Sequence, residues 1–149
     1  MHEFRIAGIR LNESHFSLIR EFKWEKNKSI EIKQNVEVGY KTKDKVLLVM
    51  VSVSSDSENQ PFRFSVAWEG AFAFKEMPSK ENLDRIADIN CAAIIFPYVR
   101  ETIADLTRCA NIPPFNLPPF NFPAMYEEKQ KIATGTVSKR PRKKAVLKK

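Results

Sequence analysis

The sequence has 149 residues and a mass of 17.2 kDa, the size of one compact domain rather than two. Its 43% hydrophobic and 29% charged residues are ordinary for a soluble globular protein. The net charge of +7 is unevenly placed. Nine of the 25 basic residues and no acid follow Glu128, which leaves 16 bases against 18 acids before it. The body of the chain is therefore mildly acidic, and only its tail is basic.

Several classes of protein are excluded by what the sequence lacks. No apolar run approaches the ~20 residues that span a bilayer, and the N-terminus lacks the apolar segment of a secretory signal. His2 and His15 are the only histidines, neither has a second ligand at a metal-site spacing, and the four glycines are too scattered for a phosphate-binding loop. The sequence thus predicts no enzyme, no cofactor and no metal site.

The two cysteines indicate the compartment. Cys91 and Cys109 are 18 residues apart in a segment that reads as helical. Along a continuous helix this is ~27 Å, which is too far for a disulfide. Both are therefore predicted to be reduced core thiols of a cytosolic protein.

The first half of the chain predicts antiparallel strands. Between Phe62 and Phe74 every second residue is bulky and apolar, apart from one glycine, and the residues between are small or polar. Residues 30–40 repeat this alternation. The continuous apolar run at 46–51 is expected of a strand that is covered on both faces. The segment 43–45 can turn the chain between these two strands.

A further strand is predicted at the N-terminus. Phe4 and Ile6 point to one face there, whereas Ile9 and Leu11 point to the other, and Gly8 marks the change of phase. Apolar residues at alternate positions between 16 and 24 suggest a similar conformation less strongly.

The second half changes to a helical period. Ser79 is a candidate N-cap, and apolar residues follow at helical spacing from Leu83 to Ala110. Pro97 should kink or restart this helix. Nearly every residue between Ala92 and Val99 is apolar, too many for a helix with one wet face. The segment is therefore expected to be buried deeply within the single chain or by a second copy, and the small number of helices favours the second copy.

Two near-copies of a pentapeptide come next, PPFNL at 113–117 and PPFNF at 118–122. Paired prolines exclude helix and sheet pairing, so the segment should run extended over a surface, as a pinned connector or as a direct binding motif. Its docking residues would be Phe115, Leu117, Phe120 and Phe122. A short helix over 124–131 follows, and the composition of residues 134–149 predicts a disordered basic tail after a domain of residues 1–133. Strands first and helices second give an α+β fold, with an antiparallel sheet covered on one face.

Residues 90–122 resemble the signature segment of the SecB family of protein-export chaperones. The resemblance rests on Ile95-Phe96-Pro97-Tyr98 with Arg100 and Glu101, and on Asn116-Leu117, Pro119 and Asn121-Phe122. It extends more loosely over residues 4–128. It implies a four-stranded antiparallel sheet, a long kinked helix and a short C-terminal helix.

The resemblance also implies a function. SecB-like proteins are ATP-independent holdases that keep unfolded preproteins competent for translocation, work as homotetramers and pass clients to SecA. The implied client-binding groove consists of aromatic residues of the sheet and connector, namely Phe62, Phe64, Trp68, Phe72, Phe115, Phe120 and Phe122. The implied subunit interface lies on the long helix, at Ile94, Ile95, Phe96, Tyr98 and Val99.

The acids that such proteins use to meet SecA are mostly missing. Glu13 is one such acid, whereas serines, Ser17 and Ser65, stand at two other positions where the resemblance implies acids. The missing acids fit a SecB-like chaperone dedicated to one antitoxin of a toxin–antitoxin pair at least as well as they fit a chaperone for export. A more distant alternative is binding of nucleic acid, the ribosome or anionic lipid through the basic tail, which carries no aromatic residue for base stacking.

Overall fold

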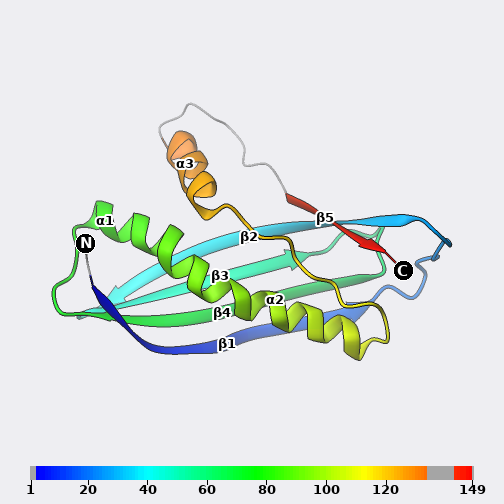
Figure 1. The fold of residues 1–149 in the computed structure, drawn as a ribbon, viewed down its shortest axis with the longest axis horizontal. Coiled ribbons are helices and arrows are strands. Elements are labelled where there is room, and N and C mark those ends of the chain that lie inside the picture. Colours follow the sequence, from blue (N-terminus) through cyan, green and yellow to red (C-terminus); the bar gives the residue numbers. More distant parts are fainter. Residues whose placement is uncertain (1–2, 134–142, 149) are drawn as a thin grey trace.

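The computed structural model describes residues 3–133 and 143–148. Four strands come first, and a helical stretch follows them (Figure 1). The strands are β1 (Phe4–Leu18), β2 (Ser29–Lys43), β3 (Val46–Ser55) and β4 (Phe62–Phe74). The later elements are α1 (Lys80–Arg85), the π-helical segment η1 (Ile86–Cys91), α2 (Ala92–Cys109), α3 (Phe122–Ala133) and β5 (Lys143–Lys148). The predicted α+β class is confirmed.

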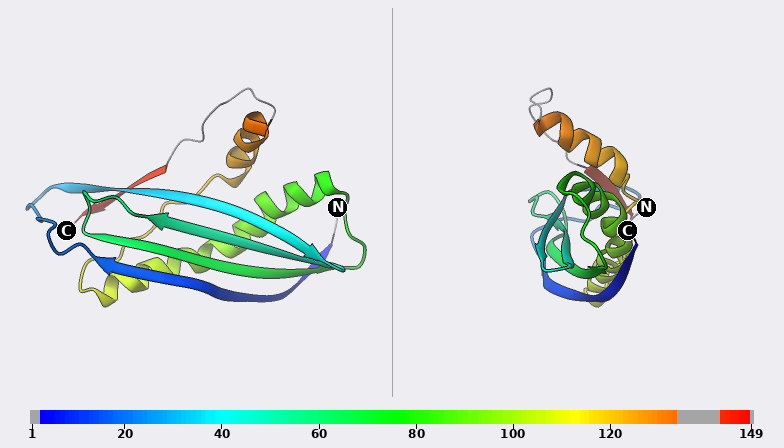
Figure 2. Two further views of the ribbon diagram at one scale, coloured as in Figure 1. Left: turned by 180° about the vertical axis from the view of Figure 1, so that it is seen from behind. Right: turned by 90° about the vertical axis from the view of Figure 1, so that its left-hand side faces the viewer.

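The sheet is antiparallel throughout, with strand order β1-β4-β3-β2-β5. Asp44, with φ of 55°, turns the chain between β2 and β3, so the predicted turn at 43–45 is confirmed. The continuous helical stretch from α1 to α2 lies diagonally across one face of the sheet. In the described chain the other face carries no helix (Figure 2).

The register of β1 corrects the predicted change of phase at Gly8. Register shifts fall between Ile6 and Gly8 and between Leu11 and Glu13. Each of these two bulges places one extra residue in β1, so Ile6 and Leu11 both lie opposite residues of β4 that face the helix. The apolar residues of β1 therefore share one face.

The structure also corrects the reading of β3 as a strand covered on both faces. Leu47, Val49, Val51 and Val53 are buried against the helical layer, whereas Val46, Leu48 and Met50 on the opposite face are half-buried. The continuous apolar run thus has one open face in the single chain.

The helical stretch begins where the sequence predicts. The Ser79 hydroxyl oxygen accepts a hydrogen bond from the backbone N–H of Asn82, as an N-cap does. Pro97 lies inside α2, which continues through it, so the restart predicted there does not occur. The π-helical segment η1 ends six residues before Pro97. The side chains of Ile95, Val99 and Ile103 in α2 are fully buried.

The connector between α2 and α3 is extended, as predicted. Asn111, with φ of 60°, ends α2, and Phe115 and Leu117 are buried. The Thr107 hydroxyl accepts a hydrogen bond from the backbone N–H of Phe115 at 2.9 Å, which fixes the connector to the last turn of α2. Asn121 Oδ1 then accepts from the backbone N–H of Ala124 and begins α3.

The tail departs from its prediction. Residues 143–148, expected to be disordered, form β5 and pair antiparallel with residues 29–34 of β2. A backbone ladder needs no apolar core, which is why composition did not reveal this strand. The rest of the predicted tail, residues 134–142 and 149, lies outside the described residues.

Cys91 is buried as predicted, and burial raises its pKa to about 12. Cys109 is exposed, which corrects its prediction as a core thiol. Both are free. In the described part of the chain no helix is long and apolar enough to cross a membrane. Nor do three His, Cys, Asp or Glu side chains within residues 3–133 and 143–148 gather as metal ligands.

Candidate functional site

Aromatic side chains fill the layer between the sheet and the helical stretch. One cluster joins β1, β4 and the connector: the ring of Phe62 lies 5.6 Å from Phe16, 6.0 Å from Phe64 and 5.8 Å from Phe115, between centroids. Phe62, Phe64 and Phe115 are all buried. The connector is therefore held on the sheet by aromatic packing as well as by Thr107.

A second cluster joins α2, the connector and α3. The ring of Phe96 contacts Phe120 at 5.1 Å and Phe122 at 5.6 Å, both edge to face. Phe96 and Phe122 are buried and Phe120 is half-buried. Such pairs contribute ~0.5–1.5 kcal/mol beyond the area they bury, so this cluster fixes where the connector enters α3.

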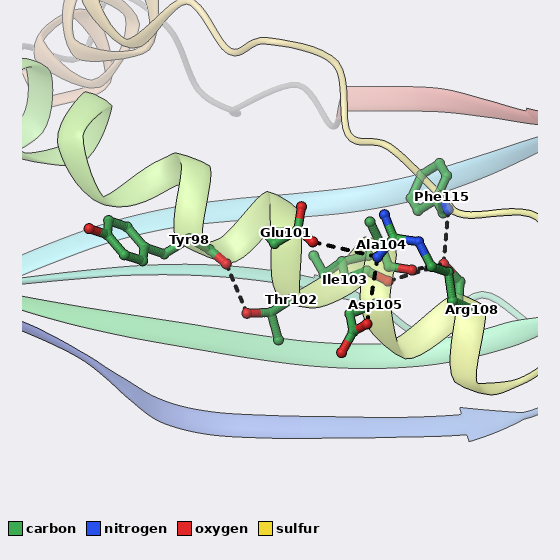
Figure 3. Close-up of polar contacts among 9 residues, drawn as sticks. Tyr98, Glu101, Thr102, Ile103, Ala104, Asp105, Arg108 and Phe115 are labelled. Carbon is green, nitrogen blue, oxygen red and sulfur yellow. Dashed lines mark hydrogen bonds and ion pairs between the residues drawn. The ribbon is translucent and has the colours of Figure 1, made fainter.

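The remaining sheet aromatics lie apart from these clusters. Phe72 is buried and packs edge to face on Phe4 at 5.3 Å. Trp68 is half-buried, stacks against Tyr98 at 5.1 Å and donates its indole N–H to the Thr102 hydroxyl at 2.8 Å. That hydroxyl donates in turn to the backbone carbonyl of Tyr98, one of the polar contacts along α2 in Figure 3.

The seven predicted groove residues thus fall into several contact groups rather than one open strip. Five are buried in the core, and Trp68 and Phe120 keep part of their surface open. Alternation in a sequence indicates which face of a strand a residue occupies but not whether a helix covers that face. That is why periodicity did not separate core from surface here.

Large apolar side chains are most exposed along the edge strand β1 and at Tyr98 of α2. Ile6, Leu11 and Leu18 of β1 are 46–48% exposed, and Tyr98 of α2 is 43% exposed. All three β1 residues lie opposite residues of β4 that face the helical layer. An edge strand with apolar residues on one face is normally covered in a soluble protein.

The predicted interface residues divide between inside and outside. Ile95, Phe96 and Val99 are buried within the single chain, Ile94 is half-buried and Tyr98 is exposed. The apolar residues of 92–99 therefore pack largely against the sheet and the connector of the same chain.

A pocket of about 410 Å³ lies beside the first half of β2 and was not predicted. Phe22 and Ile30 form the apolar part of its lining, and charged side chains, among them Lys23, Glu25 and Glu31, form much of the rest. Phe22 packs edge to face on Trp24 at 5.5 Å. In the sequence, only the apolar residues at alternate positions between 16 and 24 pointed to this pocket.

Polar contacts hold α3 against the rest of the fold. Lys129 Nζ lies 3.1 Å from Oδ2 of Asp88, a buried carboxylate of η1. Nearby the Tyr40 hydroxyl donates a hydrogen bond to the Asp84 carboxylate. Burial, followed by this hydrogen bond, raises the pKa of Tyr40 to about 12. These contacts join β2, the helical stretch and α3.

The open face of the sheet carries the three positions considered for SecA. Glu13 is exposed and lies opposite Ala67, and Ser17 and Ser65 lie opposite Arg63 and His15. An ion pair between Arg10 and Glu69, 3.0 Å apart, is on the same two strands. The structure thus places one carboxylate, Glu13, at these three positions.

The chain is similar to known proteins over most of its length. The family described as preprotein translocase subunit SecB matches residues 12–133. The protein-export protein SecB of Methylobacillus flagellatus is 37% identical over 85 residues, which cover 56% of this chain and 54% of the relative. That of Neisseria meningitidis serogroup A is 34% identical over 97 residues, 65% of this chain and 64% of the relative. The chain thus spans less than two thirds of the length of these curated relatives.

Solved structures agree with the fold. A SecB-like chaperone of Mycobacterium tuberculosis, solved with a ChAD peptide from the HigA1 antitoxin, superimposes with a TM-score of 0.67 at 18% identity. The likeness covers 78% of this chain and 90% of that one. A Streptococcus agalactiae protein of unknown function gives a TM-score of 0.51 at 14% identity, covering 80% and 99%. Because the family match extends over residues 12–133, the chain belongs to the SecB family.

Proposed function

We propose that the protein is an ATP-independent holdase that binds unfolded polypeptides in the cytosol and keeps them competent for export. The observation that carries the proposal is the apolar surface left open beside the aromatic layer of a SecB-family fold. Burial of apolar side chains gains ~25 cal/mol per Å² without directional demands, so such a surface accepts many unfolded sequences.

The half-buried side chains supply the client surface in this proposal. Trp68 and Phe120 come from the predicted groove, and Phe22 and Ile30 offer further apolar surface in a separate pocket beside β2. A client reaches Phe62 and Phe64 only where Phe115 of the connector moves off the sheet. This division gives the aromatic residues two roles, as core and as binding surface.

A homotetramer is part of the same proposal. The exposed residues of β1, together with Tyr98 of α2, offer apolar surface for contacts between copies. Pairing of β1 with a second copy would remove an open sheet edge. Tyr98 and the half-buried Ile94 are the two predicted interface residues with surface left to share.

A direct binding measurement tests the client surface. A labelled, reduced and carboxymethylated globular protein serves as a permanently unfolded probe, and binding is followed by fluorescence anisotropy without nucleotide. Phe120→Ser should weaken binding about tenfold, since it removes ~1.4 kcal/mol of apolar contact. Leu48→Ser is the matched control, because Leu48 is half-buried on the opposite face of the sheet. Equal affinities for both variants would contradict this client surface.

A chaperone dedicated to one antitoxin is the second candidate. Two observations favour it: serines stand at two of the three positions expected to be acidic, and a structural neighbour was solved with an antitoxin peptide. Glu13 alone gives a weak electrostatic contact for SecA. Affinity capture from native lysate separates the two, because SecA with many preproteins supports export and one stoichiometric antitoxin supports the dedicated role. Glu13→Lys should weaken SecA capture in the first case only.

A further inference from the structure

The two halves of β2 have different partners. Residues 35–43 pair with β3, which ends at Ser55, whereas residues 29–34 pair with β5. The second ladder runs in unbroken antiparallel register from Ser29 opposite Lys148 to Gln34 opposite Lys143. The first half of β2 is therefore a sheet edge that accepts an added strand through backbone hydrogen bonds, without demanding a particular sequence.

β5 is a weakly secured occupant of that edge. Among the described elements, β2 is the only strand with which it pairs. A two-stranded ribbon of six residues is marginal by itself in water. Only residues 134–142 separate β5 from the end of α3, so the tether returns the strand at high local concentration after each opening.

The surroundings suit an extended polypeptide. The pocket of about 410 Å³ lies along the same half of β2 and presents Phe22 and Ile30. A chain laid along the edge can place apolar side chains in this pocket.

We propose that the edge of β2 at residues 29–34 is a strand-addition site for an extended segment of an unfolded client. Residues 143–148 are its resident strand, and client and tail compete for it. This inference rests on the proposed holdase function and assigns the tail a role: it covers a sheet edge that would otherwise be open to aggregation, and it yields that edge to a client.

Truncation tests the competition. The full chain and a chain ending at Ala133 are compared for binding of the carboxymethylated probe. If β5 occupies the edge about 80% of the time, its removal lowers the apparent Kd about fivefold. A full chain with Val146→Pro, which removes one backbone donor from β5, should bind like the truncated chain. A triple Lys→Gln variant at 143, 144 and 148 controls for charge and should bind like the full chain.

A reversible lock gives the opposite perturbation. Glu31 and Val146 are Cα partners in the ladder, and directly opposite residues in antiparallel strands lie within the Cα separation of a disulfide. Glu31→Cys with Val146→Cys, in a Cys109→Ser background, should therefore oxidise to a disulfide that holds β5 in place. Oxidised protein should bind the probe at least fivefold more weakly than the same protein after reduction. The Glu31→Cys single variant should show no redox effect.

The outcomes separate this inference from the function on which it rests. If truncation, Val146→Pro and the lock all leave a measurable Kd unchanged, the holdase stands and the strand-addition site is wrong. If the disulfide fails to form, the ladder between β2 and β5 is wrong, and the proposal falls with it. If no variant binds the probe at all, the proposed function fails first and takes this inference with it.

Discussion

At the scale of single residues, Gly70 explains how closely the helix approaches the sheet. A Cβ at this position would lie 2.7 Å from Phe72 Cε2 and 3.0 Å from Ile95 Cδ1. Both neighbours are buried, so neither can move away freely. The absence of a side chain at Gly70 therefore lets α2 cover β4, and this contact places the aromatic residues around it in the core.

Gly70→Val should lower the free energy of unfolding by about 1–3 kcal/mol, because it overpacks this contact. Gly39→Val is the matched control, since nothing lies within 4 Å of a Cβ there and valine suits a strand. Urea unfolding at one fixed chain concentration measures both. Similar losses of stability in the two variants would contradict the close approach of α2 to β4.

The two cysteines should differ in reactivity. Burial raises the pKa of Cys91 to about 12, so at pH 8 almost none of it is the reactive thiolate, whereas Cys109 is exposed. A maleimide at pH 8 should modify one thiol per folded chain, at Cys109, and two thiols per chain in denaturant. Modification of Cys91 in the folded protein, located by peptide mass, would contradict its burial.

At the scale of elements, the sequence predicted what local pattern controls. Alternation identified β4, Ser79 capped the helix, and the paired prolines kept 113–121 out of helix and sheet. The bulges of β1 were invisible, because they are defined only by the partner strand. β5 was missed for a related reason, since six residues rich in lysine form a strand only beside the free half of β2.

The docking of α3 should depend on one ion pair. Lys129→Met removes the ammonium beside the buried Asp88 carboxylate and should destabilise the docked helix by about 1–2 kcal/mol. Amide hydrogen exchange in α3 should then accelerate roughly tenfold, while exchange in β3 and β4 stays unchanged. Glu127→Gln is the control on the exposed side of the same helix. Equal exchange in both variants would show that the ion pair does not hold α3.

At the scale of the whole molecule, the candidate site was only partly predictable. The sequence identified the aromatic residues, and the structure separates those that form the core, such as Phe62 and Phe115, from Trp68 and Phe120, which keep open surface. Periodicity could not make this distinction, because it depends on where α2 and the connector lie. The charge pattern gave a different kind of information: one acid, Glu13, at the three positions considered for SecA, and a basic tail that contributes a strand.

Assembly should depend on the apolar face of β1. Leu11→Asp places a charge at the exposed edge and should convert a tetramer to smaller species, as measured by sedimentation velocity. Ser17→Asp is the control, since it adds the same charge to the same strand on the open face of the sheet. A tetramer that survives Leu11→Asp, or a wild-type protein that sediments as a monomer, would contradict assembly through β1.

The proposed function requires this fold to hold unfolded chains without turnover of nucleotide. Its most direct test is light scattering while a urea-unfolded globular protein is diluted into buffer that contains the chaperone and no nucleotide. The proposed function predicts that scattering falls with increasing chaperone, reaches a plateau near a fixed stoichiometry and does not change when ATP is added. Undiminished scattering at a several-fold molar excess of folded chaperone would contradict it.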